Sequence, residues 1–191
     1  LIYTKPIQDN SEPNNRITLT DPADISTIIL APSIVDLNSS IYSNSHKYAV
    51  SNDHIYFTDT EKNKVGRISS TGEVADIATI TGASGIDLYP PDIPTVALVT
   101  STTDGWVRKI ELGSNTITNL VEFVNKKAHE IVIHPDGNSA YVSADDHTIQ
   151  KITFSSTINS NTAITGTSEI ISGESGVTAP EVNLFNKFLF Y

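Results

Sequence analysis

Short apolar runs alternate with polar turns along most of this chain, and no stretch repeats its apolar residues with the 3.6-residue period of a helix. The runs are rich in β-branched and aromatic side chains, which favour strands. Gly, Asn, Asp and Ser fill the gaps between the runs, and these residues supply the positive φ angles or local side-chain hydrogen bonds of tight turns. The pattern predicts an all-β protein.

One motif recurs along the chain: an apolar residue, any residue, a basic residue and Ile. It appears three times with a constant spacing of 42 residues, at KVGRIS (64–69), WVRKIE (106–111) and TIQKIT (148–153). A less complete copy, NNRITL, lies at 14–19. A repeat of about 40–45 residues is typical of propeller blades. The basic residues of the three copies are Arg67, Lys109 and Lys151.

Each copy of the motif is flanked by further runs with the character of strands. KYAVS (47–51) and HIYFTD (54–59) precede the first copy, and VADIATI (74–80) follows it. Each unit therefore predicts four short antiparallel strands. A single sheet of this kind cannot bury both of its faces, whereas radial stacking of several sheets buries them. We therefore predict a β-propeller of four-stranded antiparallel blades, with about four repeats in the chain.

The repeat predicts one propeller domain, or a fragment of one, over residues 1–191. A closed four-bladed ring would leave KFLFY (187–191) as a surplus strand with an exposed aromatic edge. We therefore favour a larger ring of six to eight blades, of which this chain is a part. The expected blade segments are 1–31, 46–80, 84–124, 129–172 and a partial one at 180–191.

The amino-acid composition and net charge exclude several kinds of binding partner and chemistry. Hydrophobic residues make up 38% and charged residues 18% of the 191 residues, which is ordinary for a folded domain. The net charge of −10 and the scattered Lys and Arg residues argue against a nucleic-acid partner. No apolar run approaches the roughly 20 residues of a membrane-spanning helix, so we expect no membrane insertion. With no Cys in the chain, disulfides and thiolate chemistry are excluded.

Two stretches resemble known propeller families. IYFTDTEKNKVGRISSTGEV (55–74) resembles the blades of virginiamycin B lyase-like proteins and, more loosely, NHL, YWTD and gluconolactonase-type propellers. HEIVIHPDGNSAYVSAD (129–145) resembles the YVTN-type repeat and a lyase-like blade that begins Pro-His-Gly-Ile. The lyase family uses a histidine and a glutamate near the channel with a divalent metal. The resemblance implies that His129 takes the place of the blade histidine, with Ala128 instead of the proline and Glu130 instead of the glycine.

Loops that lead into the first strands of a propeller, and loops between second and third strands, gather on one face around the channel mouth. The candidate catalytic residues in these loops are His129 and Glu130. The candidate ligand-binding residues are His46, Ser84, Asp104, Asp145 and Asp146, with His147 beside them. Carboxylates suit hard cations, so Asp59 and Glu61 are candidate ligands for Ca²⁺ or Mg²⁺.

Simpler roles remain open for these residues. Each acidic side chain in a loop would cap its own turn by accepting backbone hydrogen bonds, as Asp commonly does. The repeated basic residues would lay their stems along the sheet and keep their charges in water.

Two functions are compatible with this pattern. The first is an extracellular or cell-envelope propeller, secreted, periplasmic or on the cell surface, that serves as a scaffold or binds a small molecule or a protein or glycan ligand. The second is a metal-assisted lyase or lactonase, in which the ion polarises a carbonyl and His129 moves a proton.

Overall fold

The computed structural model describes residues 19–21, 24–28, 46–159, 164–173, 181–182 and 189–190. The chain divides into two compact units, Leu1–Asp36 and Leu37–Tyr191. In the first unit, β1 (Leu19–Asp21) pairs with β2 (Asp24–Ile28) in an antiparallel hairpin. Within the described residues, no helix is long and apolar enough to cross a membrane.

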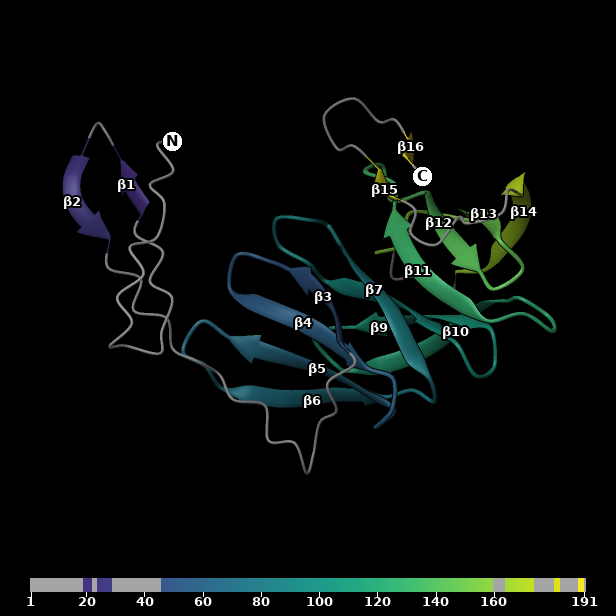
Figure 1. Cartoon of the computed structure of the whole chain (residues 1–191), viewed down its shortest axis with the longest axis horizontal. Coiled ribbons are helices and arrows are strands. Elements are labelled where there is room, and N and C mark those ends of the chain that lie inside the picture. The colour runs from purple at the N-terminus through teal and green to yellow at the C-terminus, as the bar shows by residue number, and fades with distance from the viewer. Residues whose placement is uncertain are drawn as a thin grey trace, which may run out of the picture. The chain divides into compact units, whose positions relative to one another are not determined.

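The second unit contains three sheets of four antiparallel strands (Figure 1). The first sheet consists of β3 (His46–Val50), β4 (His54–Asp59), β5 (Lys64–Ser69) and β6 (Val74–Thr79). The second consists of β7 (Ala83–Tyr89), β8 (Val96–Ser101), β9 (Trp106–Glu111) and β10 (Thr116–Glu122). The third consists of β11 (Ala128–Ile133), β12 (Ser139–Ala144), β13 (Thr148–Phe154) and β14 (Gly166–Gly173).

These sheets confirm the predicted all-β fold of four-stranded antiparallel blades. A further pair, β15 (Glu181–Val182) and β16 (Leu189–Phe190), lies near the C-terminus. Most of the predicted segments 1–31 and 180–191 lie outside the described residues. The second unit therefore holds three complete blades within its described part.

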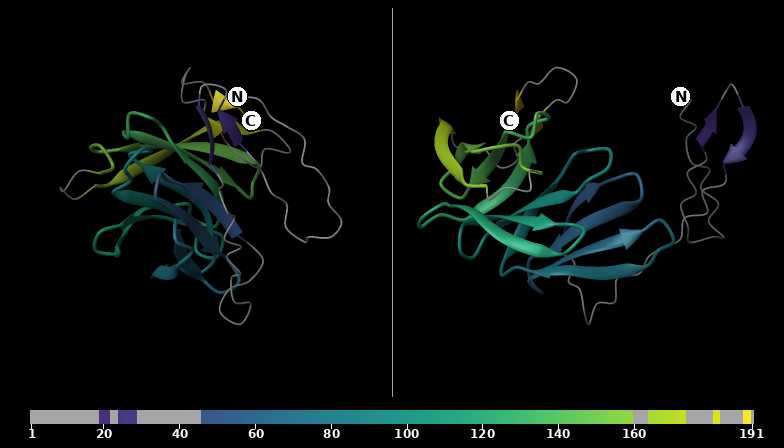
Figure 2. Two further views of the ribbon diagram at one scale, coloured as in Figure 1. Left: turned by 90° about the vertical axis from the view of Figure 1, so that its left-hand side faces the viewer. Right: turned by 180° about the vertical axis from the view of Figure 1, so that it is seen from behind.

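The 42-residue repeat is also a structural repeat. In the third strand of each blade, the basic residue stands at the same position relative to the second strand: Arg67 pairs with Tyr56, Lys109 with Leu98 and Lys151 with Tyr141. The first strands are neighbours, because β7 contacts β3 and also contacts β11. Figures 1 and 2 show the three blades following one another in chain order, with β7 between the other two first strands.

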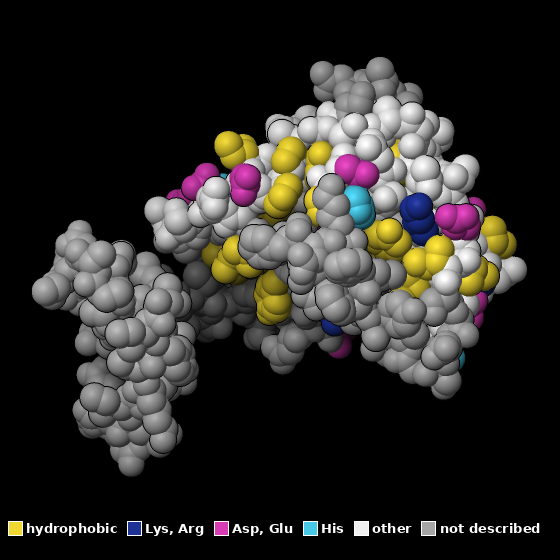
Figure 3. Space-filling view, turned by 90° about the horizontal axis from the view of Figure 1, so that it is seen from above, with side chains coloured by type: hydrophobic (Ala, Val, Ile, Leu, Met, Phe, Trp, Pro, Cys, Tyr) yellow, Lys and Arg dark blue, Asp and Glu magenta, His cyan; other side chains and the backbone are white. Residues whose placement is uncertain are grey.

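The apolar core lies between neighbouring blades. One cluster combines β8, β9 and β10 with the third blade and includes Leu98, Val107, Ile131, Val142 and Ile152. The other combines the first and second blades and includes Tyr56, Val65, Ile86, Val99 and Ile110. This is the burial that one sheet cannot achieve alone. Some large apolar side chains stay exposed, and Figure 3 shows hydrophobic side chains gathered in patches between charged ones.

Hydroxyl groups at one repeated position on the second strands connect neighbouring blades. Thr58 on β4 donates a hydrogen bond to the backbone carbonyl of Ser84 on β7. Thr100 on β8 donates in the same way to the carbonyl of His129 on β11. Each bond joins one blade to the first strand of the next, and both hydroxyls are buried.

The hydroxyl at this position also accepts a hydrogen bond within its own blade. The pairing of β7 with β8 shifts register between Ala83 and Ile86, which indicates a β-bulge. The bulge frees the N–H of Gly85, which donates to the Thr100 hydroxyl at 2.8 Å. One side chain therefore satisfies a backbone donor of its own blade and a backbone acceptor of the next.

A carboxylate on β7 makes a further link between the second and third blades. Asp87 accepts a hydrogen bond from the N–H of Ile133 on β11 at 2.6 Å and one from the N–H of Leu88 at 2.8 Å. Burial raises the pKa of Asp87 from 3.8 to about 6 despite these two bonds.

Replacing Thr100 with Val should lower the free energy of unfolding by about 2 kcal/mol or more, because a buried N–H and a buried carbonyl lose their partner. The Thr100→Ser variant is the matched control, since it keeps the hydroxyl and should lose at most about 1 kcal/mol for the missing methyl group. Urea unfolding of both variants measures the difference. Equal losses in the two variants would show that the hydroxyl contributes nothing.

Asp87 should make stability fall as the pH rises. Between pH 3.8 and about 6 the folded state holds the Asp87 proton more tightly than the unfolded state, so its contribution is full below this range and is lost through it. The expected loss is about 2 kcal/mol between pH 4 and pH 7. The Asp87→Asn variant should lack this component. The measurement is the difference in unfolding free energy between the two proteins as a function of pH, and a difference independent of pH would contradict the assignment.

Candidate functional site

The first strands of the three blades meet at a pocket of about 400 Å³, which we call the inner pocket. Lys47 comes from β3, Ser84 from β7, and His129 and Glu130 from β11. The turn between β12 and β13 adds Asp145 and His147. All three blades therefore contribute side chains to one cavity.

Backbone bulges place three of these side chains. The bulge in β7 contains Ser84, and a matching register shift in β11, between Ala128 and Ile131, contains His129 and Glu130. An extra residue in a strand re-aims the side chains next to it. In β11 the freed N–H of Glu130 donates to the hydroxyl of Ser143 at 3.1 Å. In the second blade the N–H of Gly85 donates to the hydroxyl of Thr100 at the equivalent position.

An ion pair forms part of the wall of the inner pocket. The Nζ atom of Lys47 lies 2.6 Å from Oε1 of Glu130, and their side chains are 55% and 23% exposed. The pair joins the first blade to the third, past the strand β7 that lies between them. Gly85 allows the backbone of β11 to lie close to β7, because a Cβ at Gly85 would lie 2.8 Å from the Cα of Glu130. The two charges neutralise each other at the pocket wall.

The acidic residues of two turns between second and third strands accept backbone hydrogen bonds. Asp59 accepts from the N–H of Lys62 at 2.9 Å. Asp104 accepts from the N–H of Trp106 at 3.2 Å and is held by Arg108, with 2.5 Å between Nη2 and Oδ2. Hydrogen bonds from the Arg108 guanidinium lower the pKa of Asp104 to about 2. These contacts agree with a role in capping turns.

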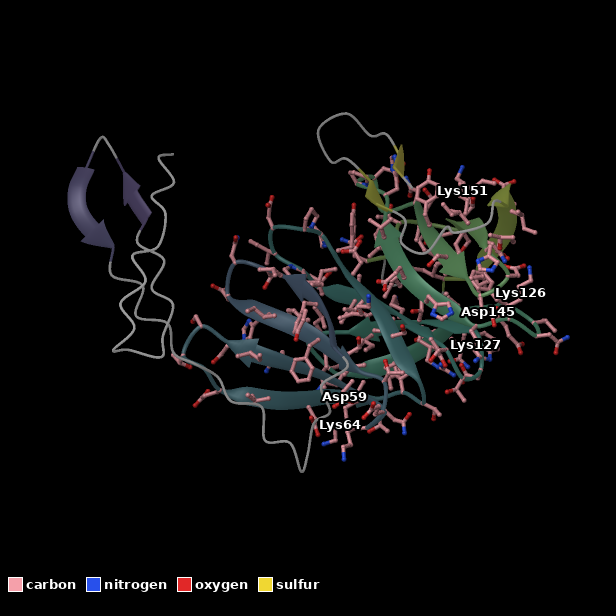
Figure 4. The ribbon with its side chains drawn as sticks, viewed as in Figure 1. Asp59, Lys64, Lys126, Lys127, Asp145 and Lys151 are labelled. Atoms are coloured by element: carbon pink, nitrogen blue, oxygen red, sulfur yellow. The ribbon has the colours of Figure 1, made fainter. Side chains whose placement is uncertain are left out.

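The third such turn carries two acidic residues, which contact two lysines of the connection between β10 and β11. Asp145 accepts from the N–H of Lys127 at 3.0 Å, and Figure 4 shows these two residues close together with Lys126 nearby. Asp146 contacts the Nζ atom of Lys126 at 2.6 Å. Partial burial opposes ionisation of Asp146, but hydrogen bonds from Lys126 and Thr148 outweigh it and lower its pKa.

His147 has a backbone role in this turn. The residue directly before the third strand has a positive φ in all three blades: 59° at Asn63, 70° at Gly105 and 62° at His147. This left-handed conformation suits Gly and Asn best, and His adopts it more often than most residues do. The conformation of the turn therefore determines the backbone position of His147. Its side chain is exposed and lines the inner pocket.

The structure brings some of the predicted site residues together and separates others. Ser84, His129, Glu130, Asp145 and His147 line the inner pocket. The lining does not include Asp59, Glu61, Asp104 or Asp146. The side chain of His46 lies outside the described part of the structure. Lys47 is not among the site residues predicted from the sequence. Its position at the start of a predicted first strand is the feature that would have indicated it.

The metal prediction concerns Asp59 and Glu61. Within the described ranges, no three His, Asp or Glu side chains come together in a way that could hold a metal ion. Asp59 already accepts a backbone hydrogen bond, and Glu61 is exposed. Because these residues do not form a ligand set, we derive no chemical step through Ca²⁺ or Mg²⁺, and the presence of either ion stays a prediction.

Together, the stacked blades and the pocket at their first strands define the class of protein, a β-propeller. No protein-family model and no curated protein matches the chain. Solved structures do match it. The hydrazine synthase of Kuenenia stuttgartiensis matches with a TM-score of 0.60 and 16% identity, over 74% of this chain and 40% of that chain.

Virginiamycin B lyase from Staphylococcus aureus matches with a TM-score of 0.57 and 19% identity, over 88% of this chain and 53% of that one. An auxiliary nutrient binding protein from Bacteroides thetaiotaomicron matches with a TM-score of 0.53 and 18% identity, over 73% and 34%. The chain thus corresponds to about half or less of each of these proteins. The resemblance to propellers of the virginiamycin B lyase type is confirmed for the fold.

The requirement for a positive φ directly before the third strand can be tested by a substitution at Gly105. A Cβ at this position would lie 2.6 Å from the carbonyl oxygen of Phe123, in a left-handed backbone conformation. We expect Gly105→Ala to lower the free energy of unfolding by at least about 2 kcal/mol. Gly113→Ala is the matched control, because a Cβ at Gly113 meets nothing within 4 Å, and its effect should stay below about 1 kcal/mol. Thermal unfolding of the pair measures both effects, and similar melting temperatures would contradict this account.

Proposed function

We propose that this propeller is a ligand-binding domain that takes a small polar molecule in the inner pocket. The observation that carries the proposal is the convergence of Ser84, His129 and Glu130, through two bulged first strands, with Lys47 of the first blade. The pocket volume of about 400 Å³ lies in the range of small-molecule sites.

The chemistry of the lining indicates what such a ligand would carry. The Lys47 ammonium group donates hydrogen bonds, the Glu130 carboxylate accepts them, and the Ser84 hydroxyl can do both. Because Lys47 and Glu130 already form an ion pair, the wall does not select strongly for one sign of charge. A sugar or a zwitterion, with donors and acceptors side by side, matches this arrangement.

The fold neighbours are compatible with binding as the general role. One of them is described as an auxiliary nutrient binding protein, although its likeness to this chain extends to the fold alone. A protein or glycan ligand at the same face, and an extracellular or cell-envelope location, stay part of the proposal. Because the inner pocket has the size of a small-molecule site, a small molecule is the most specific ligand that we propose.

The test is a binding screen of the full chain against amino acids, hexoses and short dicarboxylates, measured by saturation-transfer NMR and by thermal shift. Any compound that binds should lose at least about tenfold in affinity to the His129→Ala variant, which removes a side chain from the pocket wall. The His134→Ala variant is the matched control, because His134 does not line the pocket and instead pairs with Asp136 at 2.9 Å. Failure of the whole panel to bind, or equal affinity in the two variants, would count against the inner pocket.

A metal-assisted lyase or lactonase is the second candidate, and the position of His129 in the inner pocket beside Glu130 favours it. Virginiamycin B lyase shares the fold. The two candidates differ in one measurement. Millimolar Ca²⁺ or Mg²⁺ should raise the melting temperature if a specific ion site exists, by the mass-action effect of any ligand of the folded state. With no such shift, and no turnover of ester or lactone panels, the enzymatic candidate would be abandoned.

A further inference from the structure

The junction between the second and third blades is filled by the chain itself. Lys109 of β9 is only 5% exposed, and its Nζ atom lies 2.6 Å from Oε1 of Glu111. The expectation that this charge stays in water is therefore wrong for Lys109. Its ammonium group also donates to the carbonyl oxygen of Ile158 at 3.4 Å.

Ile158 belongs to the long connection between β13 and β14. Its side chain is fully buried in the core cluster of the second and third blades, and its N–H donates to the carbonyl of Gly137 at 2.8 Å. This segment thus supplies an aliphatic side chain to the junction and a backbone carbonyl to the basic residue of the neighbouring blade.

The junction between the first and second blades has the same construction but a shorter connection beside it. Arg67 occupies the repeat position of Lys109, and the corresponding connection, between β9 and β10, is only residues 112–115. A groove of about 880 Å³ lies here, which we call the outer groove. Among the described residues, no hydrogen bond or ion pair of the Arg67 guanidinium group is observed.

The outer groove lies at the opposite ends of the strands from the inner pocket. Tyr56, which is 4% exposed, lines it together with Arg67, and Ile93, at 77% exposed, stands on its rim. Three carboxylates also line it: Asp53, Asp92 and Glu111. An exposed aliphatic side chain with a cation and three carboxylates in the same groove matches a ligand that is aliphatic, carries an acceptor and has a positive charge beside it.

We propose that the outer groove binds a peptide segment of a partner protein in which an aliphatic residue stands next to a Lys or Arg. The aliphatic side chain packs against the exposed Ile93, and the carbonyl of the same residue accepts from Arg67, as the Ile158 carbonyl accepts from Lys109. The basic neighbour faces Asp53 and Asp92. The filled sister junction is the reason for choosing a peptide, since there the same repeat position already holds one. This site is separate from the inner pocket and does not depend on its role.

The probe is a fluorescein-labelled, C-terminally amidated peptide that copies residues 155–159, SSTIN, with Asn159→Lys to supply the positive charge. We expect it to bind the full chain, as seen in fluorescence anisotropy and in NMR shifts of the amides around Tyr56 and Thr95. Arg67→Ala should weaken binding by at least about tenfold, whereas Arg67→Lys, which reproduces the cation of the sister junction, should weaken it by less than about threefold. Replacing Ile158 by Ser in the peptide should cost at least about tenfold.

Lys151→Ala is the matched control in the protein, because Lys151 holds the same repeat position in the third blade and does not line the outer groove. Unchanged amide shifts of the core show that each variant is folded. Two results would overturn the proposal: no binding of the peptide up to about 5 mM, as expected if another segment of this chain fills the groove, or equal binding by the Arg67→Ala variant.

Discussion

A buried hydroxyl that links a second strand to the first strand of the next blade is the interaction on which this structure depends most. Thr58 and Thr100 donate to the carbonyls of Ser84 and His129, and both carbonyls lie within or beside a bulge. The same bonds that hold the blades in register therefore also hold the backbone that aims the pocket side chains. A change in packing between blades would alter the inner pocket directly.

Equivalent positions of the repeat have different surroundings because the turns between strands differ in length. Lys109 is covered by the connection between β13 and β14, and its charge is satisfied inside the protein. Arg67 stands at the same position, but the shorter connection of its neighbouring blade leaves a groove there. A propeller can thus diversify its surface without changing the strands that form its core.

Many acidic side chains of this strongly acidic chain are occupied within the protein. Asp59 and Asp104 accept backbone hydrogen bonds in their turns, and Asp87 binds the backbone of the next blade. The polar chemistry of the inner pocket comes instead mainly from the first strands, through Lys47 and Glu130. Acidity as a whole is therefore a weak guide to the site, whereas position at the start of a first strand is a good one.

The sequence by itself determined the strands, the number of strands in a blade and the repeat, because alternating apolar residues and turn formers act over a few neighbouring residues. The strands around Arg67, Lys109 and Lys151 lie where the motif predicts them. It also indicated five residues of the inner pocket. Only the tertiary structure decided that Lys47 meets Glu130 across β7 and that a groove lies beside Arg67, since both depend on bulges and turn lengths that bring distant segments together.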